Sequence, residues 1–180
     1  MVRGHSKVVD YQEYDDHQLM HQVTLEDKGA LEAIYTRYGS SVYSLAMYML
    51  KQEALAEEAT QDIFLNIWLK ASSYKTDRGE PRAWIMSVAH HKIVDVIRAR
   101  RRTLAATDPD GYETLELLPS AQISTEGEVE RNIERERILK AVATLPPPQR
   151  QVIMMAYFEG YTQSEMSEIL KQPLGTVKTR

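Results

Sequence analysis

Residues 82–102 read RAWIMSVAHHKIVDVIRARRR, a stretch whose apolar side chains recur at intervals of three and four. That spacing puts the apolar residues on one face of an α-helix. No glycine or proline interrupts the stretch, so the sequence predicts one helix from the end of a polar loop at Pro81 to about Arg102. The residues expected to be buried are Trp84, Ile85, Val88, Ala89, Ile93, Val96 and Ile97.

Two further helical stretches precede this one. The first begins near Asp16 and continues past Gly39 to Leu50, and the second runs from about Glu53 to Ala71. Three helices with apolar faces can enclose a small core. Residues 16–102 are therefore predicted to form an all-α domain behind a polar tail, residues 1–15.

The periodicity fades after Arg102, and residues 103–125 are rich in Thr, Asp, Pro, Gly, Ser and Glu. This composition is typical of a flexible acidic linker. A second small helical domain is predicted over residues 126–180. It should contain a helix from about Pro148 to Tyr157, and a short helix that runs to Leu170 and is capped by Thr162.

Composition argues against several classes of protein. The chain has no cysteine, which excludes disulfides, thiolate metal sites and a thiol nucleophile. The adjacent His90 and His91 would point in different directions on a helix, so they are not expected to share a metal. No glycine-rich phosphate loop and no membrane-length apolar run occurs. We expect a cytoplasmic protein without membrane insertion, cofactor or catalytic activity.

Charge is distributed unevenly along a chain whose net charge is only −4. A cluster of arginines ends the stretch at residues 98–102, and acidic residues dominate positions 108–136. One helical strip carries His91, Asp95, Arg98 and Arg102. The strip could contact nucleic-acid phosphates, or it could be a solvated helix end favoured by the helix dipole.

The C-terminal residues 161–180 read YTQSEMSEILKQPLGTVKTR. A capped short helix, a tight turn and a second helix with basic residues are typical of a helix-turn-helix. Met166, Ile169 and Leu170 would face the core, and Val177 would anchor the second helix. A plain helical hairpin would give the same pattern, and the pattern alone does not separate the two.

Four stretches, taken in order, resemble the extracytoplasmic-function sigma factors, group 4 of the sigma-70 family. AEEATQDIFLNIW at residues 56–68 is similar to the family's polymerase-binding helix, and residues 82–102 resemble its promoter-melting and minus-ten helix. LPPPQRQVIMMAYFEGYTQSEMSEIL at residues 145–170 resembles the start of the minus-thirty-five domain. PLGTVKTR at residues 173–180 resembles the beginning of its recognition helix.

The resemblance implies three contact surfaces. Polymerase would be bound by Glu57, Glu58, Gln61, Asp62, Phe64 and Asn66, although Phe64 could equally be a core residue. The minus-ten element would be bound by the loop residues Tyr74, Lys75, Asp77 and Arg78, which in the family surround an extruded base, and by the helix residues His91, Asp95, Arg98, Arg101 and Arg102. The minus-thirty-five element would be bound by Thr162, Thr176, Lys178 and Arg180.

The resemblance also implies partners: core RNA polymerase, promoter DNA and an anti-sigma factor. The chain departs from the family at His90 and His91, where many members have Arg-Asn, and family members continue beyond the position of Arg180. The alternative function is a helix-turn-helix regulator that acts without polymerase. That alternative would leave the helix at residues 56–68 without a purpose.

Overall fold

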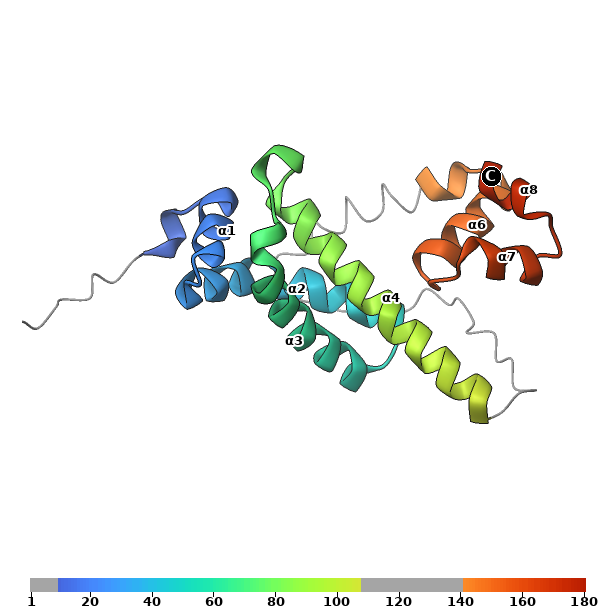
Figure 1. Ribbon diagram of the computed structural model, residues 1–180, viewed down its shortest axis with the longest axis horizontal. Helices are drawn as coiled ribbons and strands as arrows, with labels where there is room; N and C mark the ends of the chain where they lie inside the picture. The colour runs from blue at the N-terminus through green and yellow to red at the C-terminus, as the bar shows by residue number, and fades with distance from the viewer. Residues whose placement is uncertain (1–9, 108–140) are drawn as a thin grey trace, which may run out of the picture. The chain divides into compact units, whose positions relative to one another are not determined.

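The computed structural model describes residues 10–107 and 141–180, and all the regular structure in these ranges is helical (Figure 1). The predicted all-α class is confirmed. The chain divides into two compact units, Met1–Ile93 and Val94–Arg180.

The first unit contains three short 3₁₀ turns beside its helices. The elements are η1 (Tyr11–Glu13), α1 (Asp16–Thr24), α2 (Lys28–Leu50), α3 (Glu53–Lys70), η2 (Ala71–Ser73), η3 (Thr76–Arg78) and the long α4 (Pro81–Thr107), which continues into the second unit. Only Lys51 and Gln52 separate α2 from α3, so these two helices form a hairpin.

The first predicted helix is two helices, because the chain breaks between Thr24 and Lys28. Asp27 caps α2, and its Oδ1 accepts hydrogen bonds from the backbone N–H groups of Gly29 at 2.8 Å and Ala30 at 3.2 Å. Glu26 turns the chain with a left-handed φ of 63°. A side-chain cap thus overrides an apolar pattern that runs on without a proline or glycine at the break.

The core of the first unit is built from all four helices. Fully buried side chains are Leu19 and Met20 of α1, Ile34 and Val42 of α2, Ile63 and Ile67 of α3, and Ile85 and Ile93 of α4. Each contributes roughly 1.5–3 kcal/mol by leaving water. On α4 the predicted burial is confirmed for Ile85, Ala89 and Ile93, whereas Trp84, Val88, Val96 and Ile97 are half-buried.

The second unit contains α6 (Pro147–Tyr157), α7 (Gln163–Ile169) and α8 (Leu174–Thr179). Its small core consists of Val152, Met155, Met166 and Val177, with Tyr161 and Leu170 packed against it. The predicted anchor Val177 is 2% exposed. The expectation for Ile169 is wrong, since its side chain is 50% exposed. Met166 and Leu170, which are one turn apart, form the packed side of this seven-residue helix, and Ile169 lies to the solvent side of them.

The cap at Thr162 forms as the sequence predicts. Thr162 Oγ1 accepts from the Glu165 N–H at 3.2 Å, and Glu165 Oε2 accepts from the Thr162 N–H at 2.6 Å. Burial works to raise the pKa of Glu165. The hydrogen bonds from Thr162 and the charges of Arg101 and Arg98 outweigh it and lower that pKa.

The predicted linker, residues 103–125, begins inside a helix, because α4 extends past Arg102 to Thr107. The remainder of that linker, and residues 126–140 of the predicted second domain, lie outside the described residues. In the described parts of the chain, no helix is long and apolar enough to cross a membrane.

Candidate functional site

The solvent face of α3 carries most of the residues expected to bind polymerase. Glu57, Glu58 and Gln61 are exposed. Asp62 is partly exposed and pairs with Lys92 of α4, whose Nζ lies 2.8 Å from Asp62 Oδ2. Asn66 donates from Nδ2 to the Asp62 carbonyl at 2.9 Å. The structure thus brings these five polar residues together on one helix.

Phe64 has a different environment, since it is 6% exposed and packs in the core. Its ring meets that of Tyr35 edge-on, with 4.7 Å between the centroids. The packing role that the sequence left open for Phe64 is the one the structure shows.

Two leucines on α3 were missed by the sequence reasoning. Leu65 is 55% exposed and Leu69 is 67% exposed. They are four residues apart, so they lie side by side on the helix surface, next to the polar residues just described. The sequence shows that these leucines share one helix face, but the apolar pattern of α3 does not distinguish an exposed leucine from a buried one.

The loop between α3 and α4 borders a hollow of about 510 Å³. The hollow is lined by His21, Thr24, Ser72, Tyr74, Lys75, Thr76 and Asp77. Three of the four loop residues expected at the minus-ten element, Tyr74, Lys75 and Asp77, therefore meet at one place. The fourth, Arg78, belongs to η3, and its side chain lies outside the described residues.

Tyr74 forms a fixed wall of this hollow and is 9% exposed. Its hydroxyl oxygen lies 2.9 Å from His17 Nδ1 and donates to the Gly79 carbonyl at 3.3 Å, and its ring meets Trp84 edge-on at 5.7 Å between centroids. Burial raises the pKa of Tyr74, and the charges of Glu80 and Asp16 raise it further. The side chain is therefore a neutral, immobilised phenol at neutral pH.

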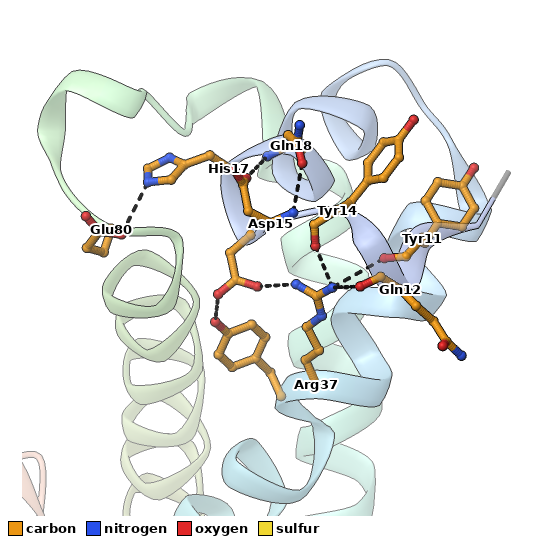
Figure 2. A network of polar contacts seen from close by, with 10 residues as sticks. Tyr11, Gln12, Tyr14, Asp15, His17, Gln18, Arg37 and Glu80 are labelled. Atoms are coloured by element: carbon orange, nitrogen blue, oxygen red, sulfur yellow. Dashed lines mark hydrogen bonds and ion pairs between the residues drawn. The ribbon is translucent and has the colours of Figure 1, made fainter.

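A polar network holds the N-terminal segment on α2 (Figure 2). The Arg37 guanidinium donates to Asp16 Oδ1 at 2.9 Å and to the carbonyls of Tyr14 at 2.5 Å and Tyr11 at 3.3 Å. The Tyr38 hydroxyl donates to the other oxygen of Asp16, and burial together with that carboxylate raises the pKa of Tyr38. Several donors on one planar group fix both η1 and α1.

Two of the arginines at the basic end of α4 are hydrogen-bonded within the protein. Within the second unit, Arg98 Nε donates to the Gly160 carbonyl at 2.9 Å, and Arg101 Nη2 donates to that of Glu159. Arg101 also stacks on the Tyr161 ring, 3.7 Å from its centroid. His91, Asp95 and Arg102 are exposed, and His91 Nδ1 lies 2.6 Å from the Ser87 carbonyl.

The helix-turn-helix residues divide in a similar way. Lys178 is exposed, while Thr176 and Arg180 are half-buried on either side of it. The Thr162 hydroxyl oxygen is already used in the cap of α7.

In the part of the chain that the structure describes, no three histidine, aspartate or glutamate side chains cluster so that they could hold a metal ion. The rings of His90 and His91 are 5.9 Å apart and inclined at 77°.

Two family models match this chain, one in each of its helical parts. The family model of sigma-70 region 2 matches residues 34–103, and that of sigma-70 region 4 matches residues 135–180. ECF RNA polymerase sigma factor SigK of Mycobacterium sp. (strain KMS) is 34% identical over 162 residues, which cover 90% of this chain and 82% of that protein. SigK of Mycobacterium tuberculosis (strain ATCC 25177 / H37Ra) is 31% identical over 163 residues, covering 90% and 85%.

Among solved structures the chain is similar to CnrH in complex with the cytosolic domain of CnrY, with a TM-score of 0.41 and 19% identity over 91% of this chain and 88% of that one. It is also similar to RpoE in complex with the anti-sigma factor NepR from Bartonella quintana. There the TM-score is 0.42 and the identity 19%, over 82% and 87% of the two chains.

A helical polymerase-binding region followed by a helix-turn-helix defines a promoter-specificity subunit of RNA polymerase. The chain belongs to the extracytoplasmic-function (ECF) sigma factors of the sigma-70 family. It is an RNA polymerase sigma factor that acts in promoter recognition and transcription initiation. A regulator that works without polymerase is not favoured.

Proposed function

We propose that this sigma factor binds core polymerase through the solvent face of α3 and receives an extruded promoter base in the hollow beside the loop at residues 72–80. The observation that carries the proposal is the exposed pair Leu65 and Leu69 beside Glu58, Gln61 and Asp62. An apolar pair rimmed by polar and charged groups is typical of a protein-binding surface.

Promoter reading at the minus-ten element is assigned to the hollow. Extruding a base from the duplex costs a few kcal/mol, which stacking and hydrogen bonds in a pocket offset. Lys75 supplies a positive charge and hydrogen-bond donors, and Asp77 supplies acceptors at the edge of the same hollow. An ordinary polar connection between helices would have no base preference, which is a measurable difference.

The exposed residues at the end of α4 would bind promoter phosphates. Arg102 is free to do so at once, whereas Arg98 and Arg101 would first have to release the carbonyls of Gly160 and Glu159. Each phosphate that is neutralised steepens the dependence of binding on salt by about 0.9 in the log–log slope. His91 and Asp95 lie along the same exposed strip and would border the melted bases.

The second unit would contact the minus-thirty-five element through the start of α8. Lys178 is exposed on this helix, with Thr176 and Arg180 two residues to either side. In a helix-turn-helix the N-terminal residues of the second helix reach base edges in the major groove. Thr162 would contribute through its cap, which fixes the start of α7.

We also propose that the protein works in the cytoplasm, performs no catalysis of its own and is inhibited by an anti-sigma factor. Polymerase supplies the chemistry of RNA synthesis, so the sigma factor needs to supply only binding surfaces. An inhibitor that covered Leu65 and Leu69 would block polymerase at the surface proposed above.

The test is assembly with core polymerase. Leu65→Ser together with Leu69→Ser should raise the dissociation constant about tenfold or more, because exposed leucines that become buried in an interface contribute strongly to affinity. Leu25 is a leucine of the first unit with a similar exposure, 62%, and Leu25→Ser is the matched control. Equal affinities for the double variant and the parent would remove α3 from the interface.

A further inference from the structure

Helix α1 lies outside the region 2 family match, which begins at residue 34, yet it borders the hollow. His21 and Thr24 contribute to the lining from α1, and the other lining residues come from the segment at residues 72–77. The two α1 residues are three apart, so they share one helix face. The hollow therefore has one wall from the loop and a second wall from α1, which lies far earlier in the chain.

His17 lies on that face of α1, one turn before His21, and connects the helix with the loop. Its Nδ1 lies 2.9 Å from the Tyr74 hydroxyl, and its Nε2 lies 3.2 Å from Glu80 Oε2, a contact drawn in Figure 2. These contacts hold both ends of the loop, since Tyr74 lies near its start and Glu80 at its end. His17 is therefore placed to set the distance between the two walls.

The α1 wall is itself held firmly. Leu19, Met20 and Val23 of this helix are buried in the core, and Arg37 holds Asp16 at its first turn. Asp15 closes a capping box with Gln18 at the start of the helix. A side chain on such a wall keeps its position when a ligand enters, which is what selection between similar ligands needs.

The two α1 residues on the hollow have suitable chemistry for a nucleobase. His21 is exposed and offers a flat ring for stacking and ring nitrogens for hydrogen bonds. The Thr24 hydroxyl donates to the His21 carbonyl at 2.6 Å, so its oxygen remains an acceptor for an amino or imino group. Lys75 and Asp77 on the loop supply a donor and an acceptor.

We propose that α1 forms the second wall of the base-receiving hollow, with His21 and Thr24 as specificity-determining residues and His17 as a positioning residue. The ligand is one unpaired nucleobase of single-stranded promoter DNA. This inference rests on the proposed function and extends it, since it assigns base discrimination to a helix that precedes the matched region.

The experiment uses the full chain assembled with core polymerase. Its probe is a promoter fork whose non-template strand is single-stranded across the minus-ten element. Each position of that element is changed to all four bases in turn, and the ratio of affinities between the best and the worst base is measured. The parent should show a ratio on the order of tenfold at the position that enters the hollow.

His21→Ala and Thr24→Val should reduce that ratio severalfold at this one position and leave the other positions unchanged. Gln22→Ala is the matched control, because Gln22 adjoins His21 on α1 but does not line the hollow. His17→Ala should also reduce the ratio, and His17→Gln should restore part of it by keeping a hydrogen bond to Glu80. A purely structural role of His17 would lower affinity for all four bases equally. Circular dichroism of each variant confirms folding.

Two outcomes separate the inference from the function on which it rests. If Lys75→Ala loses base preference while His21→Ala and Thr24→Val keep the parent ratio, the loop alone reads the base and the inference about α1 is overturned. If Lys75→Ala and all the α1 variants keep the parent ratio, the base does not enter this hollow, and the proposed minus-ten reading fails as well.

Discussion

The Nζ of Lys92 on α4 lies 2.8 Å from Oδ2 of Asp62 on α3, so a residue expected to face polymerase is already paired within the protein. The two side chains are 30% and 43% exposed, and such a surface pair contributes only about 0–1 kcal/mol to folding. Asp62 can therefore meet a basic partner at little cost in stability. A charge reversal at Asp62 would also repel Lys92, so it would not separate the ion pair within the protein from the proposed contact with polymerase.

Two neutral substitutions separate binding from pairing at this site. Asp62→Asn and Lys92→Met both remove the ion pair, and each should lower the free energy of unfolding by at most about 1 kcal/mol. Only Asp62→Asn should weaken binding to core polymerase, by about tenfold, because it removes the acid from the proposed interface. An affinity of Asp62→Asn equal to that of Lys92→Met would mean that the Asp62 carboxylate makes no contact of its own with polymerase.

The Tyr11 hydroxyl donates to Asp27 Oδ2 at 2.5 Å, and this bond gives a pH-dependent stability. Mainly because of it, the pKa of Tyr11 rises from 10.0 to about 12 and the pKa of Asp27 falls below 3.8. The contribution of Tyr11 is complete below pH 10 and is lost as pH rises towards about 12. The contribution of Asp27 is present above its unfolded pKa and is lost as pH falls through its lowered pKa.

Tyr11→Phe removes the hydrogen bond, so the parent should be the more stable at neutral pH in urea unfolding. The difference between the two midpoints should shrink as pH rises from 10 towards about 12. A difference that stayed constant over this range would mean that the hydrogen bond does not contribute to folding.

Arg37 should be the most sensitive surface position of the N-terminal network. Its guanidinium donates to Asp16 and to the carbonyls of Tyr11 and Tyr14, so one side chain ties three points of the N-terminal segment to α2. Arg37→Met should cost about 2 kcal/mol in the free energy of unfolding, and Arg37→Lys should recover only part of it because an ammonium lacks the planar fork. A loss below about 0.5 kcal/mol for Arg37→Met, within the range of ordinary surface substitutions, would contradict this role.

The arginines of α4 should differ in their effect on DNA binding by the holoenzyme. Arg102→Ala should reduce the salt slope by about 0.9, because Arg102 is exposed. Arg98→Ala should change the slope less if the bond from Arg98 to Gly160 persists in the complex. A full reduction for Arg98→Ala would show that this bond is released when DNA binds.

Sequence periodicity predicted α3 and most of α4, because a helix that packs on a core has apolar residues at every third or fourth position. It did not predict the break before Lys28, which depends on the Asp27 cap rather than on a proline or glycine. The helix cap at Thr162 could be predicted, because Thr162 and its partner Glu165 are only three residues apart in the sequence. The outward turn of Ile169 was not readable, because α7 is too short for its pattern to define a face.

Parts of the candidate site could be predicted only where the residues that form them are close together in the sequence. The polar residues of α3 and the loop residues of the hollow are such cases. His17 and His21 meet the loop from a distant part of the sequence, and no local pattern records that contact. The carbonyl partners of Arg98 and Arg101 were missed for the same reason.

The most direct test of the account is to mix the purified chain with core RNA polymerase and a library of promoters, and to measure co-elution and transcripts together. The account predicts that the chain co-elutes with core polymerase and that transcripts start at a defined subset of promoters only when it is present. A chain that bound promoter DNA by itself, failed to co-elute with core polymerase and produced no promoter-dependent transcript would contradict it.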